Sequence, residues 1–212
     1  MKVSIKYILM VLEKEGNRLS RVYDDLFGHS PTYGQLYYSL VKKLQPKFGL
    51  ELGVDRGMSA YAYLCGCDGI LVGVDLLSLD ELYPDLTYNP KWLAAEFADQ
   101  FIFMNGSTEN VVPTLHEKYE FDYVYIDAHS NDISTFGACV ARDLGLCYSL
   151  VSDKGLIVID DYSWSRGVGD VINEFKHTHP EWVEFHFQDL GMGSHQTNAA
   201  LLARYDLREV MK

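Results

Sequence analysis

Cysteine is scarce in this chain. Four of its 212 residues are cysteines, and no two of them form a C-x-x-C pair. A structural zinc site uses closely spaced cysteine pairs such as C-x-x-C, and a secreted disulfide framework is typical of shorter chains that are dense in cysteine. The four, which lie in apolar or helical stretches, are Cys65, Cys67, Cys139 and Cys147. The sequence therefore predicts reduced, buried thiols in a cytoplasmic protein and argues against zinc.

Long apolar runs are also missing. Residues 7–12 are apolar, but Glu13, Lys14 and Glu15 end this run. A membrane-spanning helix needs about 20 apolar residues, and a signal peptide needs an uncharged core of about 7 to 15. No internal repeat, low-complexity tract or Pro/Ser-rich linker interrupts the chain. We therefore expect one domain over 1–212, with helices in 1–45 and an α/β core in 46–212, and no membrane partner.

Positive charge is in short supply. The chain has 18 Lys and Arg residues against 30 Asp and Glu residues, and its formal net charge is −12. Such a surface repels nucleic-acid phosphates, so we expect no nucleic-acid partner. At 48% hydrophobic residues, the chain can bury a full core. A small-molecule partner fits this composition best, and a homodimer stays open as the assembly.

Short β-rich runs alternate along the chain with longer helical patterns, which is typical of a parallel sheet covered by helices on both faces. Strands are predicted at 48–52, 70–75, 101–105, 122–127, 155–160, 182–187 and 198–205. Helices are predicted at 33–45, 57–66, 91–99, 107–118, 133–150 and 168–178. The last two strands have no crossover helix between them and should form an antiparallel hairpin. The fold class is therefore α/β, a Rossmann-like, seven-stranded, mostly parallel sheet, with a long loop at 76–90.

The most informative segment contains Glu51, Gly53 and Gly57, followed by Asp75 at the end of the next predicted strand. Glycines at a strand-to-helix turn let the backbone pass close to a ligand. Asp75 is placed to accept hydrogen bonds from ribose hydroxyls. The spacing is G-x-x-x-G rather than the dinucleotide fingerprint G-x-G-x-x-G. The segment therefore indicates a nucleoside cofactor without a pyrophosphate.

Further acids and small polar residues follow the other predicted strands. Ligands of open α/β sheets bind outside the carboxyl ends of the strands, so these side chains should converge on one crevice. The converging set is Glu51, Asp75, Ser107, Asp127, Asp160 and Asp161. One Asp at a strand end is more often a helix cap or turn residue, but several in one crevice indicate a functional site.

These motifs together resemble the class I S-adenosylmethionine (SAM)-dependent methyltransferases, and most of all the metal-dependent O-methyltransferases of the catechol and caffeoyl-coenzyme-A type. The similar segments are Tyr33-Gly34-Gln35-Leu36, Glu51-Leu52-Gly53, Asn105-Gly106-Ser107, Tyr125-Ile126-Asp127-Ala128 and residues 155–161 with Trp164. The resemblance implies O-methylation of a small-molecule hydroxyl. It also implies cofactor binding by Glu51, Gly53, Gly57, Ser59, Asp75, Gly106, Ser107 and Asp127. By the same resemblance, Asp127, Asp160 and Asp161 would hold Mg²⁺ or another divalent cation.

The catalytic base departs from that family. Ser130 stands where the family usually has a lysine, and His129 lies one step earlier. This combination is also similar to a broader group of class I proteins that act on sugars, antibiotics or lipopolysaccharide-type substrates. We expect His129 and Asp127 to be catalytic, with capping as the other role open to His129. Trp164 and His195 lie in loops on the predicted ligand side and are candidate acceptor contacts.

Other functions stay open at this point. A nicotinamide-dependent oxidoreductase would share the fold but should show the missing glycine fingerprint. A methyltransferase-like protein could bind the cofactor without methyl transfer, or could catalyse another reaction such as hydroxylation. The remaining histidines named here, His116, His177, His179 and His186, are interpreted as surface or packing residues away from strand carboxyl ends. Tyr33, Tyr37, Tyr38, Tyr61 and Tyr63 are interpreted as helix packing.

Overall fold

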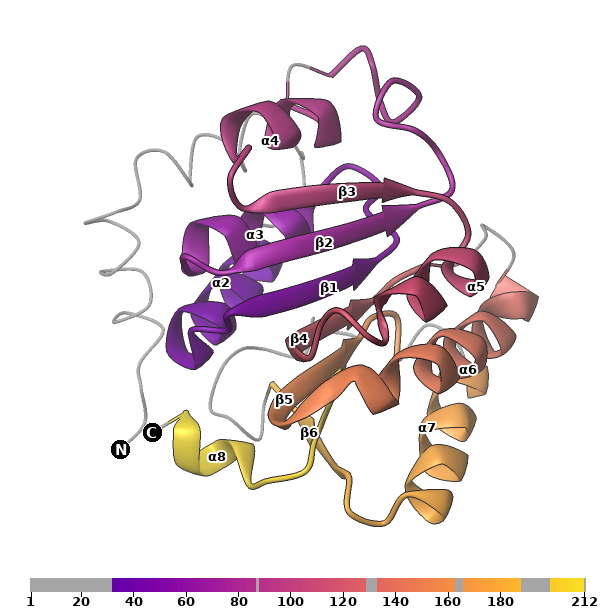
Figure 1. Ribbon diagram of the computed structural model, residues 1–212. Helices are drawn as coiled ribbons and strands as arrows, with labels where there is room; N and C mark the ends of the chain where they lie inside the picture. The colour runs from indigo at the N-terminus through magenta and orange to yellow at the C-terminus, as the bar shows by residue number, and fades with distance from the viewer. Residues whose placement is uncertain (1–31, 87, 129–132, 163–165, 188–198, 212) are drawn as a thin grey trace.

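The computed structural model describes residues 32–86, 88–128, 133–162, 166–187 and 199–211. Figure 1 shows one central sheet with helices on both of its faces. Most of the predicted N-terminal helical region, residues 1–31, lies outside the described residues. His129, Ser130, Trp164 and His195 lie outside them as well.

The described strands form one seven-stranded sheet in the order β3-β2-β1-β4-β5-β7-β6. The strands are β1 (Phe48–Leu52), β2 (Ile70–Asp75), β3 (Phe101–Asn105), β4 (Phe121–Ile126), β5 (Val151–Ile159), β6 (Val183–His186) and β7 (Ala200–Ala203). Strands β1 to β5 pair in parallel, and β7 runs antiparallel to both β5 and β6. The predicted mostly parallel sheet and its antiparallel C-terminal pair are both confirmed.

The described helices follow the predicted segments, with two interruptions and one short helix at 207–210 that the sequence did not predict. They are α2 (Thr32–Leu44), α3 (Met58–Gly66), α4 (Pro90–Glu96), α5 (Thr108–Val111), α6 (Phe136–Cys147), α7 (Arg166–Thr178) and α8 (Leu207–Val210). The helix predicted at 107–118 is only the short α5, followed by a 3₁₀ turn at Val112–Leu115. Pro113 falls in that turn, where its ring and missing N–H oppose a continuous α-helix. The helix predicted at 133–150 is α6 with a 3₁₀ turn at each end.

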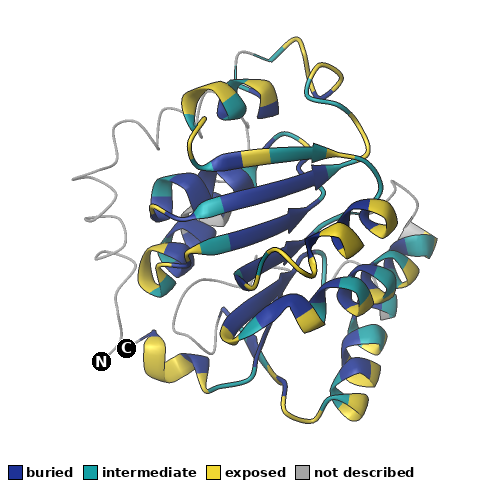
Figure 2. Cartoon of the chain, viewed as in Figure 1, coloured by how far each residue is buried: buried dark blue, intermediate teal, exposed yellow. Residues whose placement is uncertain are grey.

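Two hydrophobic cores lie on the two faces of the sheet. Neighbouring strand residues alternate between them, so that Leu71 belongs to the core under α2 and α3, while Val72 belongs to the core under α6 and α7. Figure 2 shows the central strands almost wholly buried. Strands covered on both faces need apolar residues at successive positions, which explains the apolar runs that marked them in the sequence.

Several simpler predictions hold in the described part of the chain. All four cysteines are free thiols, as predicted, but only Cys67 and Cys147 are buried, whereas Cys65 and Cys139 are partly exposed. Tyr37, Tyr38, Tyr61 and Tyr63 are buried in helix packing, as predicted. The segment 76–90 contains no strand or helix before Pro90, so it is the expected long loop. None of the described helices is both long and apolar enough to span a membrane.

Candidate functional site

A cavity of about 940 Å³ lies at the carboxyl ends of the first four strands. It is lined by Gly53, Asp55, Val74, Asp75, Leu76, Leu77, Glu81, Leu82, Tyr83, Pro84, Asp85, Leu86, Gly106, Ser107, Thr108, Glu109, Asp127, Ala128, Cys139 and Arg142. The parallel register of β1 to β4 explains the convergence, because it brings the four strand ends to one edge. The predicted residues Gly53, Asp75, Gly106, Ser107 and Asp127 therefore meet at one cavity.

The turn after β1 has glycines at two crowded positions with positive φ. Gly53 has φ +86°, and a Cβ placed there would lie 2.5 Å from the backbone oxygen of Asp127. Gly57 has φ +84°, and a Cβ there would lie 2.5 Å from Leu93 Cδ1. Only glycine tolerates both the left-handed backbone and this crowding. The turn therefore brings the ends of β1 and β4 into close contact beside the cavity.

The Asp75 carboxylate organises the same turn. Its Oδ2 accepts hydrogen bonds from the backbone N–H groups of Val54, at 2.9 Å, and Asp55, at 3.2 Å. Its Oδ1 accepts one from Leu77 N–H at 2.9 Å. An ionised carboxylate can accept about four hydrogen bonds. Asp75 therefore fixes both the glycine turn and the start of the 76–90 loop, and its Oδ1 keeps capacity for a ligand hydroxyl.

Glu51 is buried behind the turn, with 1% of its surface exposed. Its carboxylate accepts a hydrogen bond from Ser59 Oγ on α3. Burial raises the pKa of Glu51 to about 8, and the Ser59 hydrogen bond acts against that rise. A cationic ligand group would offset the desolvation and favour the ionised form. Neither Glu51, Ser59 nor Gly57 is among the residues that line the cavity.

Asp160, which follows β5, is also buried. Its Oδ2 accepts a hydrogen bond from Tyr125 Oη, and its Oδ1 accepts one from Asp161 N–H at 2.8 Å. Burial raises the pKa of Asp160 to about 7, and the nearby Asp161 charge adds to the rise. Asp161 adopts a left-handed backbone with φ 55°. Each Asp160 oxygen thus has one protein hydrogen-bond donor, Tyr125 Oη for Oδ2 and the Asp161 N–H for Oδ1.

The predicted metal ligands are not brought together by the described part of the structure. Within the ranges that the structure describes, no three His, Cys, Asp or Glu side chains are placed to share one. Asp127 lines the cavity, whereas Asp160 and Asp161 do not. The divalent cation therefore stays a prediction.

One histidine was misplaced by the sequence interpretation. His186 is the last residue of β6, and its register partner Ala200 also pairs with Ile159 at the end of β5. It therefore does lie at a strand carboxyl end. Its Nε2 lies 3.2 Å from Glu184 Oε1, and its ring centroid lies 4.9 Å from that of Tyr162. The predicted strand at 182–187 already carried this information. His116 and His177 are exposed, as expected.

The sequence interpretation missed a polar network on the wall of the cavity. Asp143 has no exposed surface, although it lies on the apolar face of α6. It accepts hydrogen bonds from Thr108 Oγ1 at 2.6 Å and from Arg142 Nε at 2.8 Å. Burial raises the pKa of Asp143, and these two hydrogen bonds act in the opposite direction. A charged residue on an otherwise apolar helix face was the available signal.

Comparison with known proteins agrees with this geometry. A sheet of this order, with a cavity at its carboxyl edge and a glycine turn beside an acid, defines the class I methyltransferase fold. The family described as "Methyltransferase domain" matches residues 50–162, more than half of the chain. The chain belongs to this methyltransferase family. No curated protein sequence matches the chain.

Solved structures with low sequence identity share the fold. The O-methyltransferase from Bacillus cereus, in complex with SAH, has a TM-score of 0.63 at 18% identity, over 93% of this chain and 94% of that one. A methyltransferase from Podospora anserina, bound to SAH, has a TM-score of 0.60 at 18% identity, over 95% of each chain. A protein from Staphylococcus aureus, provisionally assigned as a caffeoyl-CoA O-methyltransferase, has a TM-score of 0.62 at 14% identity, over 93% and 96%.

Proposed function

We propose that this protein transfers a methyl group from SAM to a hydroxyl oxygen of a small molecule. The observation that carries the proposal is the cavity at the ends of β1 to β4, with Gly53, Asp75 and Gly106 on its wall. Family membership supports methyl transfer. The B. cereus protein is an O-methyltransferase with SAH, the demethylated product of SAM, bound to it. This likeness supports an oxygen acceptor.

The cofactor would lie along the strand ends. Glu51 and Ser59 are proposed to hold its amino-acid end, where the ammonium group would stabilise the ionised carboxylate of Glu51. Asp75 would accept from the ribose hydroxyls, and Gly106 and Ser107 would border the adenine. Gly53 and Gly57 would give the backbone room to approach. When bound, SAM supplies an electrophilic methyl group on a positively charged sulfur.

The residues of the chain then have two tasks. The first is to align the acceptor oxygen with the methyl carbon, because in-line positioning provides much of the rate. The second is to accept the proton that the hydroxyl loses as the new C–O bond forms. We propose His129 as this base, with Asp127 two positions earlier in the sequence, and Trp164 and His195 as acceptor contacts. Metal assistance by Asp127, Asp160 and Asp161 is the competing proposal for the second task.

Calorimetry with SAH, SAM and NAD tests the cofactor. We expect SAH and SAM to bind more tightly than NAD, because the turn lacks the pyrophosphate fingerprint. Asp75→Ala should weaken SAH binding by about 1 to 3 kcal/mol, since ribose donors would lose a charged acceptor. Asp153→Ala, which removes an exposed carboxylate from β5, is the matched control. Tighter binding of NAD, or unchanged SAH affinity in Asp75→Ala, would contradict the assignment.

A labelled-methyl screen over phenols, catechols and sugars tests the reaction. Transfer to any of them would support O-methylation. SAH binding without transfer would instead favour the alternative of a methyltransferase-like protein with a different activity.

The same assay separates the two routes of proton removal. If His129 is the base, His129→Ala should lower turnover by about 10²- to 10⁴-fold with SAH affinity nearly unchanged. If a divalent cation ionises the acceptor, excess chelator should abolish turnover and Mg²⁺ or Mn²⁺ should restore it. His116→Ala, on the exposed surface after α5, is the control for the histidine variant. Full turnover in chelator together with an impaired His129→Ala would exclude the metal route.

A further inference from the structure

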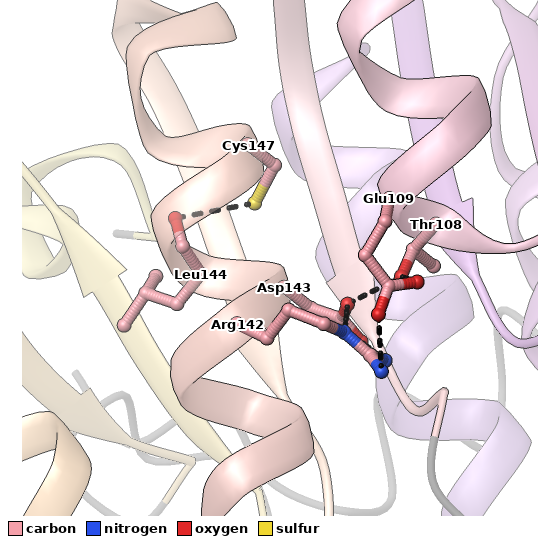
Figure 3. Close-up of polar contacts among 6 residues, drawn as sticks. All are labelled: Thr108, Glu109, Arg142, Asp143, Leu144 and Cys147. Atoms are coloured by element: carbon pink, nitrogen blue, oxygen red, sulfur yellow. Dashed lines mark hydrogen bonds and ion pairs between the residues drawn. The ribbon is translucent and has the colours of Figure 1, made fainter.

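The cavity wall between α5 and α6 contains an ion-pair network (Figure 3) that the function proposed above does not use. Arg142 donates from Nε to Asp143 Oδ1 at 2.8 Å and from Nη2 to Asp143 Oδ2 at 3.2 Å. Its Nη1 donates to Glu109 Oε1 at 3.1 Å. A guanidinium that is held by two bonds in a fork has a fixed orientation. Arg142 is therefore rigidly aimed at Glu109.

Asp143 anchors this arrangement from inside the protein. A fully buried carboxylate is costly unless it is paired and hydrogen-bonded. Arg142 and Thr108 together satisfy both oxygens of the Asp143 carboxylate. Adjacent residues on a helix do not normally face each other, yet Arg142 folds back onto its neighbour. The guanidinium is thus fixed by the fold as well as by its partner on α5.

The first turn of α5 depends on these contacts. Helix α5 has only four residues, and its N-cap residue Ser107 makes no side-chain capping hydrogen bond. A helix of this length has little stability of its own. Thr108 and Glu109, its first two residues, are the ones that α6 holds through Asp143 and Arg142. The position of this turn is therefore set by α6.

That turn is a wall of the cavity. Gly106, Ser107, Thr108 and Glu109 all line it, and so does Arg142. Among the described lining residues Arg142 is the single cation, and its charge is shared between Asp143 and Glu109. It is therefore not placed as an anion site for a phosphate. Its geometry suits the positioning of the wall.

We propose that Arg142 is a positioning residue for cofactor binding. It acts through Glu109 to hold the 106–109 wall at the distance that the adenosine end of the cofactor requires. This inference rests on the proposed function. Arg142 itself makes no contact with the reacting atoms in this proposal.

The test is a double-mutant cycle on SAH binding, measured by calorimetry with Arg142→Ala, Glu109→Gln and the double variant. Arg142→Ala should weaken SAH binding about 10-fold or more, because small displacements of a binding wall are costly. If Arg142 acts through Glu109, the double variant should bind SAH as tightly as the single variant that has the larger loss of affinity. The proposal would be overturned if the fold-loss in SAH affinity of the double variant equals the product of the two single losses. Unchanged SAH affinity in Arg142→Ala would overturn it as well.

A ligand fragment locates the effect. 5′-Methylthioadenosine keeps the adenosine end of SAH and lacks its amino-acid end. Arg142→Ala should weaken this fragment and SAH by the same factor, whereas Ser59→Ala should weaken SAH alone. Loss of SAH affinity with unchanged fragment affinity in Arg142→Ala would contradict a role at the adenosine end.

Two further variants guard against misfolding. Arg142→Ala leaves Asp143 buried without its ion-pair partner and can unfold the protein. A double variant, Arg142→Gln with Asp143→Asn, avoids this because it replaces the ion pair by two neutral amide side chains. This double variant should lose as much SAH affinity as Arg142→Ala. Arg208→Ala is the matched control, since Arg208 forms a two-bond pair with Asp206 on α8, outside the cavity lining. If the wild-type protein binds no SAH, the proposed function fails. If the wild-type protein binds SAH and the Arg142 variants bind it equally tightly, only the present inference fails.

Discussion

At the scale of single residues, the site is built from carboxylates whose surroundings differ. Asp75 accepts three backbone N–H groups at the cavity edge. Glu51 and Asp160 are buried, and burial raises the pKa of each, to about 8 and about 7. A buried carboxylate favours its protonated form until a cation or donor compensates the lost hydration. Near neutral pH, burial therefore shifts both carboxyl groups toward their uncharged, protonated forms.

This burial predicts how stability depends on pH. The pKa of Glu51 rises from 4.5 in the unfolded chain to about 8 in the folded protein. The folded state then binds more protons than the unfolded state between these values, so the free energy of unfolding falls as pH rises through this range. The contribution of Glu51 is about 3 to 5 kcal/mol at most. Glu51→Gln should remove this pH-dependent contribution. Urea unfolding at pH 5 and pH 8 measures the free energy of unfolding that checks it.

Two comparisons check this assignment. The raised pKa of Asp160 also makes the free energy of unfolding fall as pH rises, over a lower pH range. Part of the pH dependence of stability should therefore persist in Glu51→Gln. Glu209→Gln, an exposed change on α8, should leave the slope intact. A Glu51→Gln protein with the wild-type difference in stability between pH 5 and pH 8 would show that Glu51 is ionised in the folded apo state.

At the scale of elements, the long loop 76–90 is tied to the glycine turn. Tyr83 Oη donates to Asp55 Oδ1 at 2.6 Å, and Arg56 Cζ lies 5.0 Å from the centroid of the Tyr83 ring. Tyr83 and Asp55 both adopt left-handed backbones, with φ 48° and 47°. Such conformations are unfavourable for non-glycine residues and persist where surrounding contacts hold them. Both residues line the cavity, so this contact joins two of its walls.

Loosening the loop should speed ligand release. Tyr83→Phe removes the hydroxyl and keeps the ring under Arg56. We expect the loss of one hydrogen bond, worth about 0.5 to 1.5 kcal/mol, to raise the SAH dissociation rate about 2- to 12-fold. Stopped-flow fluorescence measures that rate. Tyr88→Phe, on the same loop, is the control, and equal dissociation rates for Tyr83→Phe and wild type would exclude a role for the loop in retaining the ligand.

At the scale of the whole molecule, net charge and topology agree with the proposed cofactor. The chain carries a formal charge of −12. The described cavity wall has six carboxylate residues, which are Asp55, Asp75, Glu81, Asp85, Glu109 and Asp127. Such a field favours a cationic sulfonium cofactor and opposes one that carries phosphates. The parallel register of β1 to β4 concentrates these acids at one edge.

The sequence alone determined the fold class and the limits of the first three strands, whereas the observed bounds of β4 to β7 differ from the predicted ones by one to four residues. The bounds of β1, β2 and β3 agree with their predicted ranges. Strands buried on both faces need continuous apolar runs, so the local sequence specifies where these strands begin and end. Gly53 and Gly57 do lie at the predicted strand-to-helix turn, both with positive φ, and their approach to a ligand stays a prediction.

Only the tertiary structure decided which individual side chains become partners. Arg142 and Glu109 lie on separate helices, and no local pattern relates them before α5 and α6 pack together. The contact between Tyr125 and Asp160 likewise depends on the pairing of β4 with β5. The shifts in the pKa of Glu51 and Asp160 follow from burial, which is a property of the packed molecule and not of the residue. Local periodicity specifies elements, whereas side-chain partners and desolvation arise only when those elements are assembled.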